Sequence, residues 1–527
     1  MTSIVDQMYE RMKDDTEQME ESLPQGTSAI RRYFAGKTIF FTGATGFMGK
    51  CFVEKVLRDI PELKKLYVLV RQKKGVPPEE KMKKYFQNII FDRVRKMRPN
   101  FEEKVVTIRG DLQAAELGLS DEDRRLLIDE VDLWVHNGAT TKFDELISVA
   151  LKINVLATKS MLDLALAGKR TQSFMYVSTA YSHCYNQDIE EKFYQAPTDM
   201  DSVYELIKAD EASPNGLPEH VMKLKLGKWP NSYCFTKSLA EDLVRQYGET
   251  APFPCAIYRP SIVTCSLKEP LDGWVGNVNG PAYIFMGTGL GAVHVTYYLG
   301  YPMDLIPADL ANNALIASIY DLPERWKTER RGLVYNFGSS TTNPTYLDTL
   351  SVYLMEEAPK IGSMKMLWYP FMFFVDKKWL FWIGHAFLHF LPALFADLAL
   401  LIMGKKPRAL SLFWFGTKHL SKVFYFVNGN WRIHMSNTLK LHDRLSPMDK
   451  KIFYFDIQNL DWYSYCIRYI RGVRVHILKE PLDNVEKAVK SYRFLKRAHY
   501  TTMAVLFSLL LYFVLLPLLS RILSIFF

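Results

Sequence analysis

Short apolar runs alternate with longer amphipathic stretches between residue 37 and about residue 260. Runs rich in β-branched and aromatic residues that are separated by helical periodicity are typical of βαβ units around a parallel sheet. The predicted strands are Thr38–Thr42, Leu66–Val70, Val105–Arg109, Leu133–His136, Ser173–Val177 and Cys255–Tyr258. A returning strand is predicted at Leu333–Phe337, and helices are predicted at Glu79–Met97 and Tyr233–Tyr247. The fold class is therefore α/β, a doubly wound parallel Rossmann sheet.

The pattern changes after Pro260, where glycine, proline and aromatic residues predominate, including Trp274–Gly291. Such segments suit binding loops over the carboxyl edge of the sheet. From about residue 355 to 500 the chain is aromatic-rich and helical, which predicts a smaller, mostly helical C-terminal domain. The expected domains are a mobile, acidic lead-in (1–36), a dinucleotide-binding domain with its loops (37–354), the helical domain (355–498) and a membrane anchor (499–527).

The anchor is predicted from Thr501–Ser520, an uncharged and mostly apolar stretch about long enough to span a bilayer as a helix. The alternative is a buried core helix. A basic collar precedes the stretch, and by the positive-inside tendency it keeps the rest of the chain in the cytosol. The collar consists of Lys487, Lys490, Arg493, Lys496 and Arg497.

Composition narrows the classes of partner. The net charge of +9 arises from 66 basic residues mixed with 57 acidic ones, and no nucleic-acid-binding motif is present, so we expect lipid and phosphate ligands and no nucleic acid. The six cysteines form no Cys-x-x-Cys pair, which favours a reducing compartment. The N-terminus lacks the apolar core of a secretory signal.

The strongest local motif follows the first predicted strand. It is a glycine-rich turn that leads into a helix, as a dinucleotide fingerprint requires, because its glycines permit a tight turn, close approach of a pyrophosphate and helix packing. Its predicted cofactor-binding residues are Gly43, Thr45, Gly46, Phe47, Met48 and Gly49.

Two further positions bear on the choice of cofactor. Arg71, followed by Lys73 and Lys74, stands at the end of the second strand, where an NAD-specific enzyme would place an acid. A guanidinium there favours the 2′-phosphate of NADPH. Asp111, after the third strand, is expected to accept a hydrogen bond from the adenine amino group.

A Tyr-x-x-x-Lys pair places both side chains on one helix face, and the chain contains five such pairs. Only Tyr233 and Lys237 combine a predicted helix with an upstream hydroxyl cluster at a strand end. Tyr204 and Lys208 are the alternative pair. We predict that Tyr233 donates a proton to a substrate oxyanion and that Lys237 lowers the pKa of Tyr233. Tyr233 and Lys237 are also predicted to bind the cofactor, with Lys237 reaching the nicotinamide ribose.

The hydroxyl that holds the substrate oxygen is predicted to be Thr179, with Ser178 as the alternative. No metal site is predicted. His385 and His389 have i,i+4 spacing, but no glutamate follows the first histidine and no third ligand is evident. Cys184 and Cys234 flank the site in sequence without a readable base, which makes packing their expected role.

Taken together, these motifs resemble the extended short-chain dehydrogenase/reductases, and among them the insect-type alcohol-forming fatty acyl-CoA reductases. The resemblance runs through the glycine turn, Leu69–Gly75, Gly110–Leu112, His136–Thr140, Tyr176–Tyr181, Tyr233–Lys237 and Tyr258–Val263. His389–Ala393, Asp397 and Gly404–Pro407 resemble the helical domain of these reductases. The chain departs from the family at Asn137-Gly138, where an Ala-Ala pair is expected. The resemblance implies further cofactor contacts at Leu112, Asn137, Ala139, Pro260 and Val263.

The resemblance also implies a reaction, the two-step reduction of a long-chain fatty acyl-CoA to a primary alcohol with two NADPH and release of CoA. The rival functions are a membrane-bound sterol or ketone oxidoreductase and a catalytically silent lipid-binding protein. Membrane lipid is an expected partner, a homo-oligomer is compatible with the sequence, and the expected location is the endoplasmic reticulum, with the peroxisomal membrane as the alternative.

Two very apolar stretches, Met366–Phe374 and Trp379–Met403, leave a choice open. They can span a membrane, lie in its interface or cover an acyl-chain pocket. His385, His389, Pro392 and Asp397 interrupt the second stretch, which favours the interface or the pocket over a lipid-exposed span.

Overall fold

A computed structural model describes residues 27–72, 77–276, 280–481, 483–517 and 520–521. Its centre is a seven-stranded parallel sheet in the order β11-β7-β5-β4-β1-β2-β3. The strands are β1 (Thr38–Thr42), β2 (Lys65–Val70), β3 (Val105–Arg109), β4 (Leu133–His136), β5 (Ser173–Val177), β7 (Cys255–Pro260) and β11 (Leu333–Phe337). The predicted Rossmann fold is confirmed.

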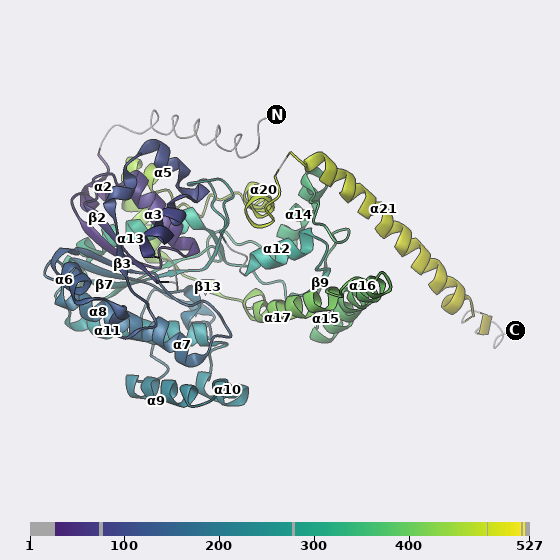
Figure 1. The fold of residues 1–527 in the computed structure, drawn as a ribbon, viewed down its shortest axis with the longest axis horizontal. Coiled ribbons are helices and arrows are strands. Elements are labelled where there is room, and N and C mark those ends of the chain that lie inside the picture. The colour runs from purple at the N-terminus through teal and green to yellow at the C-terminus, as the bar shows by residue number, and fades with distance from the viewer. Residues whose placement is uncertain (1–26, 73–76, 277–279, 482, 518–519, 522–527) are drawn as a thin grey trace.

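Helices cover both faces of the sheet (Figure 1). One layer contains α2 (Ala29–Phe34), α3 (Phe47–Asp59) and α13 (Ala308–Glu329), and the other contains α6 (Asp121–Glu130), α8 (Ala157–Ala167) and α11 (Ser232–Thr250). Neighbouring residues of β1 point to opposite layers. Phe41 belongs to the core under α3 and α13, whereas Phe40 belongs to the core under α8 and α11. A strand buried on both faces reads as a continuous apolar run, which is why the strands were predictable.

The helix predicted at Glu79–Met97 was wrong in its continuity. The structure divides it into α4 (Pro78–Phe86), a short turn η1 (Ile89–Phe91) and α5 (Asp92–Met97). The side chain of Asn88 accepts a hydrogen bond from the Ile90 N–H and so caps the start of η1. The break brings Phe86 and Phe91 together edge to face with their ring centroids 5.3 Å apart, so aromatic packing replaces one turn of helix.

The N-terminal segment was expected to be mobile as a whole. Residues 1–26 lie outside the described residues, but α2 is packed, with Ile30 and Phe34 fully buried. Ser28 begins this helix and donates a hydrogen bond of 2.5 Å to Asp449, far along the chain. The expectation was therefore wrong for α2, because two buried apolar side chains and the hydrogen bonds of Ser28, Ala29 and Ile30 to Asp449 hold it against the domain.

Further short helices and strands lie between the strands of the sheet along the chain. They are η2 (Phe101–Lys104), η3 (Ala115–Gly118), α7 (Ile147–Leu151), η4 (Lys152–Leu156), η5 (Ala180–His183), β6 (Asp188–Ile189), α9 (Met200–Glu211), α10 (Glu219–Leu226), β8 (Ile262–Thr264), α12 (Pro281–Gly289), β9 (Val295–Tyr297) and β10 (Leu305–Pro307). Two of these strands pair in parallel with strands from the C-terminal part, β9 with β12 and β6 with β13.

The C-terminal part is mostly helical, as predicted. Much of it extends away from the sheet (Figure 1), whereas its helix Ser436–Arg444 packs against α13 and β11. Its elements are α14 (Leu347–Ile361), β12 (Phe373–Val375), α15 (Lys378–His385), η6 (Ala386–Phe390), α16 (Leu391–Ile402), α17 (Ala409–Val427), β13 (Arg432–Ile433), α18 (Ser436–Arg444), α19 (Pro447–Ile452), α20 (Trp462–Gly472), η7 (Val473–Ile477), α21 (Val485–Leu510) and η8 (Leu511–Leu515).

Two continuous helical segments within the described residues, Lys378–Ile402 and Val485–Leu515, are long and apolar enough to cross a membrane. The second begins beside α20 and runs out beyond the rest of the molecule (Figure 1). The side chains from Thr501 to Leu516 are exposed along the whole of that protruding stretch. The structure is therefore compatible with membrane anchoring through the C-terminal helix and does not place this helix in a protein core.

Close backbone packing joins α20 to the loop before α12. A Cβ added to Gly472 would lie 1.7 Å from the carbonyl oxygen of Gly273. We expect Gly472→Ala to destabilise the protein by about 1–3 kcal/mol, because overpacking at this backbone contact outweighs the better helix propensity of alanine. Thermal unfolding in detergent measures the change. Ser464→Ala, on the same helix, is the control, and an unchanged melting temperature for Gly472→Ala would contradict the prediction.

Candidate active site

The turn between β1 and α3 is built around glycines that no larger residue can replace. Gly43 has φ +80°, and an added Cβ would lie 2.8 Å from the Gly138 nitrogen. At Gly49 an added Cβ would lie 2.0 Å from the carbonyl oxygen of Gly43. The first turn of α3 therefore sits directly against the end of β1, with Gly46 as its N-cap and Phe47 and Met48 as its first residues. This arrangement suits a pyrophosphate at a helix N-terminus.

The departure from the family at Asn137-Gly138 has a local physical reason. A Cβ added to Gly138 would lie 2.6 Å from Cδ1 of Leu112 and 3.1 Å from Oγ1 of Thr42. The Gly138 N–H donates a hydrogen bond to Thr42 (3.0 Å), whose hydroxyl also bonds Nδ1 of His136 (2.7 Å). The loop after β4 is thereby pinned to the glycine turn, with Asn137 and Ala139 on either side of the contact.

Arg71 and Asp111 meet at the carboxyl ends of β2 and β3. Arg71 Nε lies 2.9 Å from Asp111 Oδ2, and about two thirds of the arginine side chain is exposed. Asp111 also accepts a hydrogen bond from the Gln113 N–H. Asp111 is thus engaged by Arg71 on one oxygen and by its own turn on the other, while the remaining guanidinium nitrogens of Arg71 face solvent. Lys73 and Lys74 lie outside the described residues.

The predicted catalytic side chains come together at the end of β5. Tyr233, in the first turn of α11, is hydrogen-bonded to the side chain of Thr179. Ser178 points elsewhere, because its hydroxyl donates a 2.5 Å hydrogen bond to the buried Glu241. Of the two hydroxyls left open by the sequence, only that of Thr179 faces Tyr233.

Lys237 stands one turn beyond Tyr233, and its amine contacts the end of β5. Its Nζ donates a 2.7 Å hydrogen bond to the carbonyl of Val177 and lies 4.6 Å from the ring centroid of Tyr176. Burial raises the pKa of Tyr233 above its ordinary value, and the hydrogen bond from Thr179 only partly opposes this. Lys237 is not among the groups that shift the Tyr233 pKa in this arrangement, so its predicted lowering of that pKa stays a prediction.

Burial lowers the pKa of Lys237 to about 7, in spite of the nearby carboxylate of Glu241. The amine is therefore poised between two protonation states near neutral pH, which suits a relay group. The alternative pair, Tyr204 and Lys208, lies on α9 with both side chains exposed, away from the end of β5. The structure thus brings one of the two candidate pairs to the hydroxyl cluster and leaves the other at the surface.

Glu241 is the residue that the sequence did not single out. It is buried one turn beyond Lys237 on α11 and accepts hydrogen bonds from Ser178, Ser182 (2.8 Å) and both guanidinium branches of Arg259 (2.9 and 2.6 Å). Burial by itself would raise its pKa, but Arg259 and His183 hold the pKa of Glu241 well below the ordinary value. The one available sequence signal was the i,i+4 spacing of Glu241 from Lys237. This spacing does not reveal that the partner of Glu241 is Arg259 on β7.

Pro260 and Val263, which complete the predicted cofactor contacts, follow this arginine. Pro260 ends β7 beside β11, and Val263 lies in β8, which pairs with β10. Both positions are at the carboxyl edge of the sheet, on the side of the glycine turn. No described residue group has the composition of a metal site, and His385 and His389 bond to each other through Nδ1 (2.7 Å).

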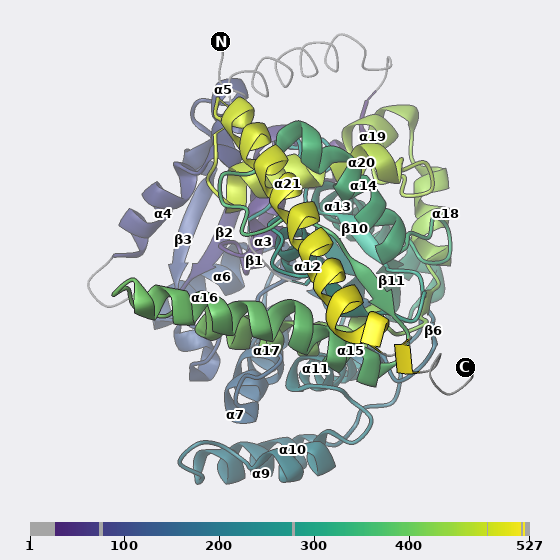
Figure 2. The same ribbon diagram turned by 90° about the vertical axis from the view of Figure 1, so that its right-hand side faces the viewer.

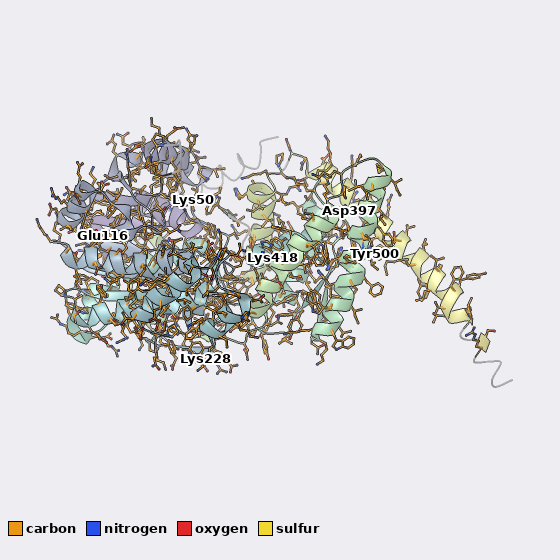
Figure 3. All side chains as sticks on the ribbon, turned by 60° about the horizontal axis from the view of Figure 1, so that its bottom comes forward. Lys50, Glu116, Lys228, Asp397, Lys418 and Tyr500 are labelled. Carbon is orange, nitrogen blue, oxygen red and sulfur yellow. The ribbon has the colours of Figure 1, made fainter. Side chains whose placement is uncertain are left out.

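Helix α17 of the C-terminal part closes over this edge. Lys422 and Lys418 form ion pairs of 2.8 and 3.3 Å with Asp144 in the loop after β4. In the same loop, the ring of Phe143 lies 5.0 Å from Phe426 and 6.1 Å from Tyr233. Figure 3 shows Lys418 between the sheet domain and the outer helices. The residue types suit an apolar substrate that approaches Tyr233 under a protein cover.

A cavity of about 740 Å³ opens next to this cover. The cavity is bounded by the loop that follows Thr179, by α15 and by the inner side of α17. Tyr425 and Trp431 donate hydrogen bonds to the Cys184 carbonyl on its wall. Cys184 in turn interacts with Cys234, which follows Tyr233 in α11, so the cavity wall adjoins the helix that carries the candidate proton donor. Its volume is in the usual range for small-molecule sites.

Comparisons with known proteins agree with this arrangement. Residues 41–315 match the NAD-binding model of the family described as male sterility protein, and residues 388–480 match a second model with that description. The rat protein "Fatty acyl-CoA reductase 1" is 34% identical over 474 residues, which cover 90% of each chain. The Drosophila melanogaster protein "Fatty acyl-CoA reductase wat" is 32% identical over 485 residues, 92% of each chain.

Solved structures show a similar fold at low identity. The terminal R domain from the myxalamid PKS-NRPS biosynthetic pathway has a TM-score of 0.56 at 20% identity, over 88% of this chain and 98% of that domain. The reductase domain of a nonribosomal peptide synthetase from Mycobacterium tuberculosis has a TM-score of 0.55 at 16% identity, over 87% and 94%. These likenesses concern the fold alone.

The glycine turn yields a test of nicotinamide cofactor binding. Gly43 and Gly36 both have positive φ, but an added Cβ meets backbone atoms at Gly43 and nothing within 4 Å at Gly36. We expect Gly43→Ala to weaken binding of the reduced cofactor by at least about tenfold, because the turn must move from its place under the pyrophosphate. Gly36→Ala is the matched control. Fluorescence titration of the cofactor measures both, and equal affinities would disprove the assignment.

Proposed function

Because the chain belongs to the fatty acyl-CoA reductase family, we propose that it reduces long-chain fatty acyl-CoA to the primary fatty alcohol with NADPH and releases CoA. The observation that carries the proposal is the Tyr233–Thr179 pair, which lies at the carboxyl edge of the sheet beneath the aromatic cover of α17. A proton donor and a second hydroxyl beside a nicotinamide site are what carbonyl reduction requires.

The glycine turn between β1 and α3 and the guanidinium of Arg71 would hold the cofactor. Bound NADPH supplies hydride. The first hydride added to the thioester carbon gives a tetrahedral oxyanion, which accepts hydrogen bonds from Thr179 and Tyr233. Collapse of this adduct breaks the carbon–sulfur bond, CoA leaves as the thiolate, and the aldehyde remains.

A second hydride converts the aldehyde carbon to the alcohol level. The resulting alkoxide takes the phenolic proton of Tyr233. Lys237, one helical turn away with a pKa of about 7, is the proposed source of the proton that restores the phenol. The raised pKa of Tyr233 keeps the phenol protonated until a more strongly basic oxyanion forms next to it. No covalent bond between enzyme and substrate is needed.

We further propose how the protein is oriented in its membrane and which membrane this is. The apolar helix that ends the described chain would enter the bilayer from the cytosolic side, because the basic collar in α21 stays with the catalytic part. The endoplasmic reticulum is the proposed membrane, with the peroxisomal membrane as the alternative. A membrane location suits a reductase whose substrate and product both carry long apolar chains.

The reaction itself is tested with the detergent-solubilised protein. With palmitoyl-CoA we expect fatty alcohol to form and about two NADPH to be oxidised for each CoA released. Tyr233→Phe should lower kcat at least about a hundredfold, because the proton donor is lost. Thr179→Val should also lower kcat, whereas Ser178→Ala, which removes only a bond to Glu241, should retain cofactor binding and most of the turnover.

Chain lengths from 12 to 24 carbons should be included, as a rough range for fatty acyl substrates. Cofactor binding without turnover on any of them would contradict the acyl-CoA assignment and point to sterols or ketones. Aldehyde as the sole product would contradict the alcohol-forming part.

The choice of NADPH over NADH is tested at Arg71. We expect Arg71→Ala to raise the KM for NADPH about tenfold and to leave the KM for NADH unchanged, because a charge-assisted contact to the 2′-phosphate is lost. Arg109→Ala is the matched control, since Arg109 is also exposed at a strand end and pairs with an acid, Glu79. Equal effects of Arg71→Ala on both cofactors would disprove this role.

A further inference from the structure

The outer surface of the C-terminal helices is apolar over an unusually wide area. We call it the apolar platform and define it as the exposed apolar side chains of α15, η6, α16 and α17. Its most exposed members include Trp379, Phe387, Phe395, Ile402 and Trp414, each more than half exposed. Soluble monomers rarely leave so many large apolar side chains together in water, so a contiguous face of this kind marks an interaction surface.

The opposite side of the same helices is fixed to the sheet domain. The N–H of His294, just before β9, donates a 2.8 Å hydrogen bond to Nε2 of His389. The Cβ position of Gly384 lies 3.3 Å from the side chain of Val295. His385 is buried and bonds Thr417 of α17 (2.8 Å), which joins the two helices. The segment Lys378–Ile402 is therefore long enough to span a bilayer, but protein covers one side along α15 and η6.

The turn between α16 and α17 is also rigid. One oxygen of Asp397 accepts hydrogen bonds from the N–H groups of Arg408 and Ala409, and the other accepts one from Leu410. This carboxylate caps the start of α17, so the acidic residue inside the apolar stretch has a structural task and does not face lipid. The α16–α17 hairpin thus presents a fixed apolar surface.

Basic residues border the platform at both ends. Lys377 precedes α15 and forms an ion pair of 3.5 Å with Asp376, Lys378 begins α15, and the exposed Lys405, Lys406 and Arg408 form the turn after α16. Asp397 is the sole acidic residue in the sequence between Lys377 and Arg408. Apolar side chains bounded by lysine and arginine are the pattern of helices that lie in the interface of an anionic leaflet.

The platform and α21 share one side of the molecule. Figure 2 shows α16 and α21 in front of the remaining elements, on the face turned toward the viewer. In Figure 3, Asp397 and Tyr500 both lie at the end of the molecule opposite Glu116. A bilayer that receives the apolar end of α21 therefore also faces α15, α16 and α17.

We propose that the apolar platform lies in the headgroup–acyl boundary of the membrane, parallel to its surface, as a second lipid contact beside α21. The helices do not cross the bilayer, because their inner side is bound to the sheet domain. The cavity of about 740 Å³ is lined by residues of α15 and α17, so the helices that contact the lipid also border the cavity. For the acyl-CoA reaction, and resting on that proposed function, the apolar chain would then enter from the interface.

The proposal is tested with the full-length protein in vesicles of phosphatidylcholine and phosphatidylserine that carry brominated acyl chains, which quench nearby tryptophans. The segment Val485–Phe527 contains no tryptophan, so the anchor contributes nothing to the signal. We expect the double variant Trp379→Phe/Trp414→Phe to lose roughly half of the bromolipid-dependent quenching. Trp326→Phe, in α13 within the sheet domain, is the matched control and should lose none.

Unchanged quenching in the double variant, with the protein still floating on the vesicles, would overturn the proposal. So would protection of the platform by a second copy of the chain, seen as a dimer on the vesicles with unquenched tryptophans. A second variant, Lys405→Glu/Lys406→Glu, should reduce quenching in the anionic vesicles and leave it unchanged in phosphatidylcholine alone. None of these measurements requires turnover, so they stand apart from the test of the reaction.

Discussion

The buried ion pair between Glu241 and Arg259 is the constraint on which the geometry of the site depends. Arg259 is fully buried near the end of β7, and Glu241 reaches it from α11 while it also holds Ser178 and Ser182 after β5. The pair therefore ties one helix to two neighbouring strands at the level of the site. Removal of one partner from such a pair costs about 3–5 kcal/mol, because the other charge is left buried alone.

The ion pair sets the positions of the side chains that are proposed to react. Tyr233 and Lys237 precede Glu241 by two turns and one turn of the same helix, so the anchoring of Glu241 fixes their height along β5. Ser178 is drawn to Glu241, which leaves Thr179 alone to face Tyr233. Adjacent hydroxyls just after β5 thus have different tasks, because they contact residues two turns apart on the same helix.

This division explains what the sequence could and could not predict. The seven strands and the glycine turn depend on local pattern, since a strand buried on both faces is an apolar run and a tight turn needs glycine at fixed spacing. The pairing of Glu241 with Arg259, the role of Lys237 and the break at Asn88 depend on partners that are remote in sequence or on aromatic packing. The contact of the Lys237 amine with the Val177 carbonyl was not predictable, because spacing on a helix does not fix where a flexible amine finds its acceptor.

The membrane contact of the C-terminal helices also depends on partners that are remote in sequence. From composition alone Lys378–Ile402 was an ambiguous apolar stretch, because a spanning helix, an interfacial helix and a pocket cover share their residue types. The contacts of His389 with His294 and of His385 with Thr417 give one side of this stretch a protein partner. One side of this helical stretch is bound to protein and the other exposes apolar side chains. Both sides are buried only where the stretch lies between the protein and the lipid. Because α15, within this stretch, also lines the cavity, one element borders both the cavity and the exposed apolar surface.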